Sequence, residues 1–271
     1  MTDMDFRGAS ADAVAALTDE LKAAVSGSAA ATTADALFAA SGTFRSEAAL
    51  RRFATDGAIA AEAKSGLVTQ VFGSALDDAS VRLLASAVSR RWTHGGDLPN
   101  ALERLSEIAA LLSAGSEATQ VGNELFALGR AVTENPELRD GLSDPGRSVE
   151  DKAALLDRLL DGKALPATVT LAKQALAGSY GTVEAALDTY RKLASEVQGE
   201  GVATVTVAKP LTDDQTLRLT TALGRIYGRK IHANVVTDPA VIGGVKVEIG
   251  DDVIDGSIAN KLDLATRQMA G

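Results

Sequence analysis

The amino-acid sequence predicts a mostly α-helical protein, in which a tandem helical bundle is followed by a small α/β C-terminal domain. The composition is rich in Ala and Leu, while aromatic residues make up only 4%, and this mixture favours closely packed helices. The segment before residue 200 repeats itself, which indicates that a six-helix-type domain is duplicated. After residue 200 the pattern changes to β-branched residues, which are typical of strands. We therefore expect domains at residues 1–112, 113–199 and 202–271.

The first 200 residues carry the spacing of amphipathic helices. Apolar residues recur every three or four positions, as in Val14, Leu17 and Leu21. Asn135-Pro136 predicts a helix start, because Asn can cap a helix and Pro suits its first position. Ser148 followed by Asp151 resembles a capping box in acidic form.

The internal repeat has an offset of 88 residues. At this offset Leu37-Phe38-Ala39 matches Leu125-Phe126-Ala127, and Trp92 meets Tyr180. Further matches are Leu50-Arg51 with Leu138-Arg139, Leu67 with Leu155, Ala13 with Ala101 and Leu17 with Leu105. The last two pairs make the helix near residues 98–113 the counterpart of the first helix in the repeat. We therefore expect this helix to close the first bundle and to open the second.

The tail reads as a small β-α-β-β-α domain. Residues 202–207 are mostly β-branched and predict a strand. Thr212-Asp213-Asp214-Gln215 is a capping box that opens a helix to about Tyr227, with Leu219, Leu223 and Ile226 expected on one face. Alternation then predicts strands at residues 231–236 and 245–249. A turn leads into Val253-Ile254, and Ser257 is placed to cap a last helix.

Residues 242–262, IGGVKVEIGDDVIDGSIANKL, resemble the C-terminal signature of the ATP synthase delta subunit family, called OSCP in mitochondria. The motif residues are expected to be structural rather than catalytic. Gly243 and Gly244 allow positive φ or a bulge, and Gly250 with Asp251 permits a tight turn. Asp255-Gly256-Ser257 reverses the chain before the last helix. Ordinary family members have one six-helix domain before this tail, so the chain is similar to a long bacterial form with a duplicated helical domain.

The resemblance implies a non-catalytic subunit of the peripheral stalk, or stator, of F1Fo ATP synthase. The helical part is then expected to bind the N-terminal helices of the alpha subunits in the F1 head. The C-terminal domain is expected to bind the end of the b subunit, so that the head resists rotor torque. The implied location is the cytoplasmic side of the cell membrane, as a peripheral protein within the complex.

The first helix is a candidate for the partner-binding groove, with Val14, Leu17 and Leu21 lining it. The alternative, which we favour, is that these residues form the core of the bundle. No motif in the sequence singles out groove residues, so both interpretations stay open.

Several function classes are disfavoured by composition. The net charge is −9, and no Lys/Arg cluster suits a nucleic acid. There are no cysteines and only two histidines, His94 and His232; His94 is expected at a helix C-terminus, and His232 has no metal partner at ligand spacing. Carboxylate pairs on helices are interpreted as solvated surface. We therefore expect no catalytic residues, metal, cofactor or small-molecule substrate.

The start, MTDMDF, lacks the apolar segment of a signal peptide, and no apolar run reaches the ~18–20 residues that span a bilayer. The charge excess lies entirely in residues 1–201, because residues 202–271 contain eight acidic and eight basic residues. The competing hypothesis is a stand-alone acidic helical adaptor or regulatory protein. It explains the acidic helices equally well, but not the resemblance of the tail.

Overall fold

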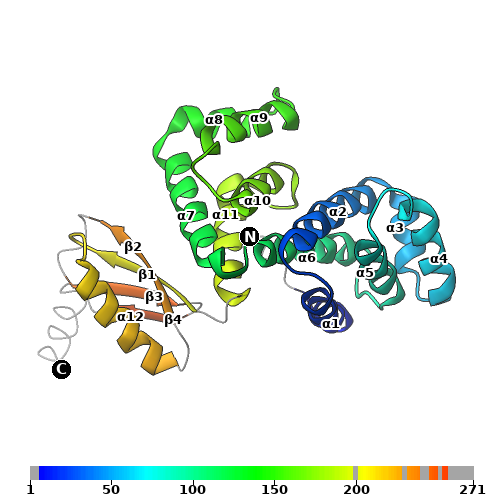
Figure 1. Cartoon of the computed structure of the whole chain (residues 1–271), viewed down its shortest axis with the longest axis horizontal. Coiled ribbons are helices and arrows are strands. Elements are labelled where there is room, and N and C mark those ends of the chain that lie inside the picture. Colours follow the sequence, from blue (N-terminus) through cyan, green and yellow to red (C-terminus); the bar gives the residue numbers. More distant parts are fainter. Residues whose placement is uncertain (1–5, 198–200, 228–230, 239–243, 250–251, 256–271) are drawn as a thin grey trace, which may run out of the picture. The chain divides into compact units, whose positions relative to one another are not determined.

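The structure is a computed structural model that describes residues 6–197, 201–227, 231–238, 244–249 and 252–255. The chain divides into two compact units, one up to Ala194 and one from Ser195 onward. The first is helical, and the second holds a sheet with a helix packed on it (Figure 1). The predicted fold class, mostly α with a small α/β domain, is confirmed.

The described part of the first unit consists of helices joined by short turns. In chain order they are α1 Ala9–Ala24, α2 Gly27–Ser46, α3 Ala48–Thr55, α4 Ala61–Phe72, α5 Asp78–Ser89 and α6 Asp97–Ser113. After the 3₁₀ turn η1 Gly115–Glu117 come α7 Ala118–Glu134, α8 Pro136–Ser143, α9 Val149–Leu160, α10 Pro166–Ala177 and α11 Val183–Val197.

The helix boundaries recur at the same offset as the sequence. Helices α8, α9 and α10 each begin and end 88 residues after α3, α4 and α5, and α6 begins 88 residues after α1. Helix α6 therefore corresponds to α1, and α10 corresponds to α5. The placing of a domain boundary at residues 112 and 113 stays a prediction.

Helix α6 belongs to both repeats. It contacts α1, α2 and α5 of the first repeat, and α7 and α10 of the second (Figure 1). Most of its residues are buried, including the polar Glu103, Ser106 and Glu107. The two repeats are thus joined through a continuous packed helix, followed by the single turn η1.

Two predicted helix caps are confirmed. The Asn135 side chain accepts a hydrogen bond from the Leu138 amide at 3.4 Å, and Pro136 occupies the first turn. The Ser148 hydroxyl accepts from the Asp151 amide at 3.1 Å. Each cap satisfies an amide that the helix itself leaves without a partner.

The described strands of the second unit are β1 Gly201–Val207, β2 Ile231–Thr237, β3 Val245–Ile249 and β4 Asp252–Asp255, with helix α12 Asp213–Tyr227 between β1 and β2. The strand order is β2-β1-β3-β4. Strands β1 and β2 are parallel, so α12 is the crossover between them, while β3 runs antiparallel to β1 and to β4. The core lies between sheet and helix, and its buried residues are Ala203, Val205, Val207, Leu223, Ile231, Val247 and Ile249.

The start of α12 confirms the predicted capping box. The Gln215 amide donates to the Thr212 hydroxyl at 3.3 Å, and the Thr212 amide donates to Gln215 Oε1 at 2.9 Å. The expected position of Ile226 is wrong, because its side chain is 68% exposed. Leu219, Leu223 and Tyr227, spaced by four, pack toward the core instead, so Tyr227 takes the place expected for Ile226.

The tail motif is only partly described. Gly244 has a φ of 89°, the left-handed conformation that glycine adopts without strain. Strand β4 contains Val253 and Ile254 and was not predicted as a strand, since four residues are too few to show alternation. Asp255 ends β4, while Gly243, Gly250, Asp251, Gly256, Ser257 and the expected last helix lie outside the described residues.

Candidate partner-binding surface

Helix α1 presents one buried and one open side. Leu17 and Leu21 are fully buried, whereas Val14 is only half-buried. The two leucines continue a stripe with Ser10 and Ala13 that faces the core. Of the three residues proposed to line a groove, only Val14 therefore reaches the surface, and the burial of the leucines favours the core interpretation.

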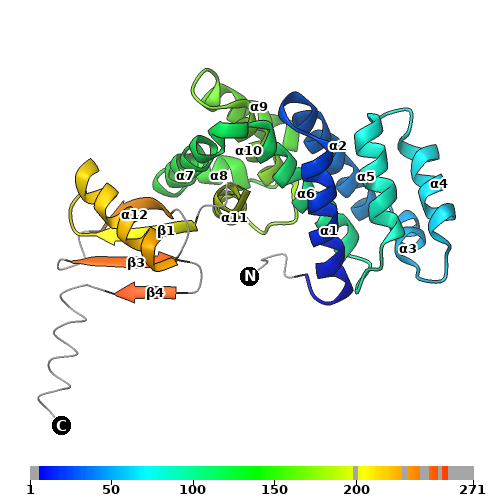
Figure 2. The ribbon, with the colours of Figure 1, turned by 60° about the horizontal axis from the view of Figure 1, so that its bottom comes forward.

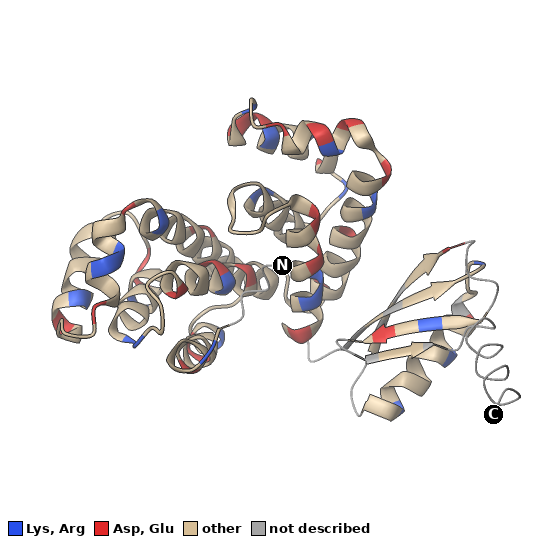
Figure 3. Ribbon diagram, turned by 180° about the vertical axis from the view of Figure 1, so that it is seen from behind, with Lys and Arg blue, Asp and Glu red and all other residues tan. Residues whose placement is uncertain are grey.

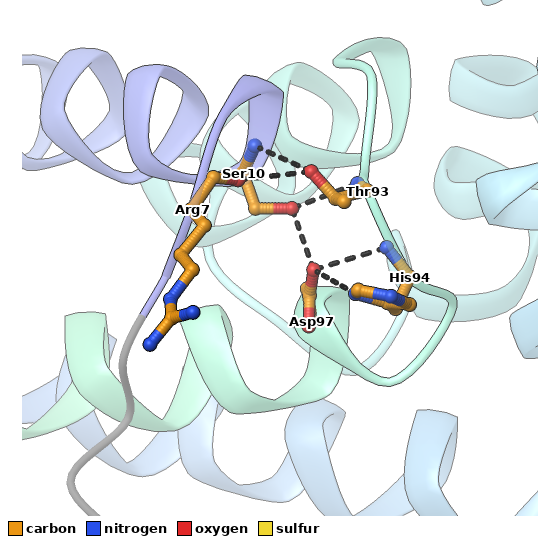
Figure 4. A network of polar contacts seen from close by, with 5 residues as sticks. All are labelled: Arg7, Ser10, Thr93, His94 and Asp97. Atoms are coloured by element: carbon orange, nitrogen blue, oxygen red, sulfur yellow. Dashed lines mark hydrogen bonds and ion pairs between the residues drawn. The ribbon is translucent and has the colours of Figure 1, made fainter.

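A polar network fixes the start of α1 to the start of α6 (Figure 4). The Ser10 hydroxyl donates to Asp97 Oδ2 at 2.6 Å and accepts from the Thr93 amide at 2.8 Å. The Thr93 hydroxyl donates in turn to the Arg7 carbonyl at 2.9 Å. The network holds α1 in a fixed position, so that its open side is presented by a rigid element.

His94 belongs to this network through its backbone. Its amide donates to Asp97 Oδ2 at 3.0 Å, and its ring Nδ1 lies 3.6 Å from the same oxygen. The expected place at a helix C-terminus is wrong, since α5 ends at Ser89 and His94 lies just before α6. The side chain is 80% exposed, which suits a surface residue of the turn.

The open side of α1 consists mainly of small side chains. We define the outer face of α1 as the residues Ala11, Val14, Ala15, Thr18, Asp19 and Lys22, all of which are half-buried or exposed. Helix α1 packs against α5 and α6 (Figure 2). Val81 and Ala85 of α5 are also half-buried. Small side chains let a second helix approach closely, so this face can accept an amphipathic helix.

Acidic and basic residues are interspersed along the helices of the first unit (Figure 3). Ion pairs occupy several of them, for example Lys173 with Asp157 at 2.7 Å and Arg130 with Glu134. The outer face of α1 carries one acidic and one basic residue, Asp19 and Lys22, and Asp12 adjoins it. Counted together, these residues are two acidic and one basic.

Two carboxylates of α6 are buried at the joint between the repeats. Glu103 accepts hydrogen bonds from the Arg45 guanidinium of α2 and from the Ser179 amide, the latter at 2.7 Å. Glu107 accepts from the Tyr180 hydroxyl at 2.9 Å, and Arg104 Nη1 lies 3.2 Å from its other oxygen. These contacts link α6 to α2 and to the turn after α10.

The electrostatics of Glu107 follow from its burial. Burial raises the pKa of Glu107 to about 8, and Arg104 and Tyr180 counteract this only in part. The pKa of Tyr180 is raised by burial and by the nearby Glu107. The Tyr180 ring meets the Tyr190 ring edge-on with 5.5 Å between centroids, so the donor to Glu107 packs against a second buried aromatic ring.

This pair is not predicted from the sequence, because carboxylates on helices are interpreted there as solvated surface. The available signal was the expectation that the helix near residues 98–113 serves both bundles. A helix that packs against both bundles is covered on both sides, so acidic residues one turn apart on it, such as Glu103 and Glu107, are expected to be buried. Their contacts hold α6 to its neighbours from both repeats.

A surface hollow of about 610 Å³ lies where α9 turns into α10. Its lining includes the apolar residues Leu160, Pro166 and Val169 and the acidic residues Asp157 and Asp161. At the equivalent place in the first repeat α4 ends at Phe72, whose ring packs with its centroid 5.9 Å from that of Phe44. The counterparts of Phe44 and Phe72 at the offset of 88 are the smaller Val132 and Leu160.

Comparison with known proteins identifies the family. The family model described as ATP synthase delta (OSCP) subunit matches residues 108–269. The chain belongs to this family. Among its relatives is the ATP synthase subunit delta of Nocardioides sp., which is 50% identical over 212 residues, 78% of this chain and 77% of the relative. That of Streptomyces avermitilis is 41% identical over 214 residues, 78% of each chain.

A solved structure of the Toxoplasma gondii mitochondrial ATP synthase hexamer contains a chain that aligns at a TM-score of 0.38 and 20% identity. The alignment covers 61% of this chain and 96% of that chain. A likeness at this level supports no statement about function.

The match to the OSCP family begins inside α6 and continues through α7–α11 into the second unit. It therefore covers the second helical repeat and the C-terminal unit. Residues 1–107, which form nearly all of the first repeat, lie outside the match. The first repeat is thus the part of the chain that departs from the family model.

The described part of the C-terminal unit exposes apolar side chains on two elements. Leu217 and Ile226 of α12 are 65% and 68% exposed, and Val253 and Ile254 of β4 are 58% and 43% exposed. Large apolar side chains at a protein surface mark candidate contacts with a partner. Val253 and Ile254 are neighbours in a strand and point to opposite faces of the sheet, so the four residues mark the C-terminal unit, rather than one face of it, as the second candidate surface of this family member.

Within the described residues, no cluster of His, Asp and Glu side chains is arranged to hold a metal ion. The same residues contain no helix whose length and apolar character would let it cross a membrane.

Proposed function

We propose that the chain is the peripheral-stalk subunit that connects the catalytic head of ATP synthase to the b subunit and so resists rotor torque. The observation that carries the proposal is membership of the delta (OSCP) family over residues 108–269. The role is mechanical and non-catalytic. Its working properties are the affinity for both partners and the stiffness between them.

The shared helix α6 supports the required stiffness. A connector that resists torque must transmit force without a flexible joint, and the repeats are joined by a buried helix rather than by a loose linker. The contacts of Glu103 and Glu107 tie this helix to neighbours from both repeats.

We assign the N-terminal helix of an alpha subunit to the outer face of α1. Its small and partly apolar residues suit an amphipathic helix, which would bury Val14 and the flanking alanines. We assign the end of the b subunit to the C-terminal unit, where Leu217 and Ile226 of α12 are exposed. In the complex, the chain would lie on the cytoplasmic side of the membrane.

Co-purification tests this assignment with the full chain. The tagged protein is isolated from gently solubilised membranes of its host, and its partners are identified by mass spectrometry. We expect the alpha, beta and b subunits. In a second experiment, the tagged chain is mixed with purified alpha and b subunits. There Val14→Asp is expected to lower the recovery of alpha but not of b, whereas Leu217→Asp combined with Ile226→Asp has the reverse effect.

Val71→Asp is the matched control, because Val71 of α4 is 44% exposed and belongs to neither surface. It is expected to leave both partners in place. Recovery of none of these subunits by a folded chain would contradict the proposal and favour the stand-alone adaptor.

A further inference from the structure

The internal repeat lets α1 and α6 be compared position by position. Both helices bury the same core stripe, which is Ser10, Ala13, Leu17 and Leu21 in α1 and Leu98, Ala101, Leu105 and Ala109 in α6. Each pair is separated by 88 residues. On this side the two helices play the same part in their repeats.

They differ on the other side. The counterparts of the outer face of α1 are Pro99, Leu102, Glu103, Ser106, Glu107 and Ala110, and all six are buried. We call these six residues the covered face of α6. The same repeat position is thus open in the first copy and closed in the second.

Helix α2 of the first repeat provides much of this cover. Its contacts with α6 are the most extensive between any two described elements, and it also contacts α10. Its Arg45 reaches across to Glu103 and to Asn100, the latter at 3.3 Å. Helices α6 and α10 of the second repeat correspond to α1 and α5 of the first. Helix α2 therefore packs on the pair α6 and α10, whereas the equivalent pair α1 and α5 has an open side.

We propose that the chain has one open docking face of this kind and not two, because α2 permanently occupies the equivalent face of the second repeat. The outer face of α1 accepts a single amphipathic helix, and the duplicated domain adds no second site. This inference rests on the proposed function for the identity of the helix. The docking face therefore lies on α1 of the first repeat, which is outside the family match, because the equivalent face on α6 is covered.

The way α2 packs on α6 indicates which kind of helix the equivalent outer face of α1 accepts. The buried residues of α2 are mostly Ala, Ser and Thr, which allow close approach, and its basic residue Arg45 meets a carboxylate of α6. The counterparts of Asn100 and Glu107 on α1 are Asp12 and Asp19, which are exposed. The expected occupant is a helix with a stripe of small apolar residues and a basic residue that can reach either Asp.

The number of sites is tested by calorimetric titration of the full chain with a synthetic peptide of the N-terminal segment of its own alpha subunit. We expect one peptide per chain and loss of binding in Val14→Asp, with Val71→Asp unchanged. Two equivalent peptides per chain would overturn the inference and leave the proposed function standing.

Cysteine labelling tests the closed face without any partner. The chain has no cysteine, and Thr18 and Ser106 occupy the same repeat position. Ser106 is buried, and among the described residues its hydroxyl has no hydrogen-bond partner, so Ser106→Cys loses no such bond. We expect a thiol reagent to modify Thr18→Cys at least about tenfold faster than Ser106→Cys, because the buried site reacts only after local opening.

The peptide should slow the modification of Thr18→Cys and leave that of Ser106→Cys unchanged. Equal rates in the two variants without peptide would overturn the closed face. If Thr18→Cys reacts faster than Ser106→Cys but the peptide does not bind at all, the proposed function is contradicted and the docking assignment on α1 is overturned.

Discussion

Glu103 and Glu107 lie one helical turn apart in α6, and both are buried in a chain whose other described carboxylates are largely at the surface. Each is held by donors from another part of the first unit, namely Arg45 and Ser179 for Glu103 and Tyr180 for Glu107. A buried carboxyl is tolerated when such donors satisfy it. These residues could not be identified from the sequence, because their burial depends on which elements cover α6.

Replacing Tyr180 by Phe tests the contribution of its hydrogen bond. Tyr180→Phe removes the hydroxyl that donates to Glu107 and leaves a buried carboxyl with one donor fewer, so the free energy of unfolding should fall by roughly 1–3 kcal/mol. Tyr190→Phe is the matched control, since among the described residues the buried Tyr190 hydroxyl has no hydrogen-bond partner. Urea unfolding of the three proteins measures the difference, and an equal loss in both variants would contradict this role of Tyr180.

The raised pKa of Glu107 predicts a pH dependence of stability. Its ordinary value is 4.5, and in the folded chain it is about 8. Between these values the folded state binds more protons than the unfolded state, so the contribution of Glu107 to stability falls as pH rises from about 4.5 to about 8. Below and above this window the contribution is constant.

Glu107→Gln removes the titrating group and retains an acceptor for Tyr180. Its free energy of unfolding should therefore decline less between pH 5 and 8 than that of the unchanged chain, as measured by urea unfolding at several pH values. Parallel curves for the two proteins would show that Glu107 titrates normally.

Helices and strands of this chain follow largely from local sequence. The caps at Asn135, Ser148 and Thr212 were predicted and are present, since each needs only a side chain and an amide three residues away. Ile226 was placed wrongly, because spacing alone does not show that Tyr227 completes the buried stripe. Strand β4 was missed because its pairing with β3 is not encoded in its own four residues.

Equivalent helices α4 and α9 differ in their caps, which provides a reciprocal test. Ser148 caps α9, whereas its counterpart Ala60 gives α4 no side-chain cap. Ser148→Ala should lower the free energy of unfolding by about 1 kcal/mol, and Ala60→Ser should raise it by up to about the same amount. Thermal and urea unfolding measure both; a stabilising Ser148→Ala would be inconsistent with the cap.

At the scale of the whole molecule, the duplication and the shared helix were both visible in the sequence, through matches such as Ala13 with Ala101 and Leu17 with Leu105. The packing of α2 across α6 and α10 was not, because it arises from the way the repeats fold onto one another. The sequence thus suggested two equivalent bundles, whereas the structure shows that their first helices are covered differently.

The connection between head and stalk is tested most directly by reconstitution. Purified catalytic head and the cytoplasmic segment of the b subunit are mixed with and without the full chain, and the masses of the complexes are measured in solution. We expect a complex of all three that forms only when the chain is present and contains one copy of it per head. If the chain binds only one of the two at a time, or if the head and b associate equally well without it, it does not connect them.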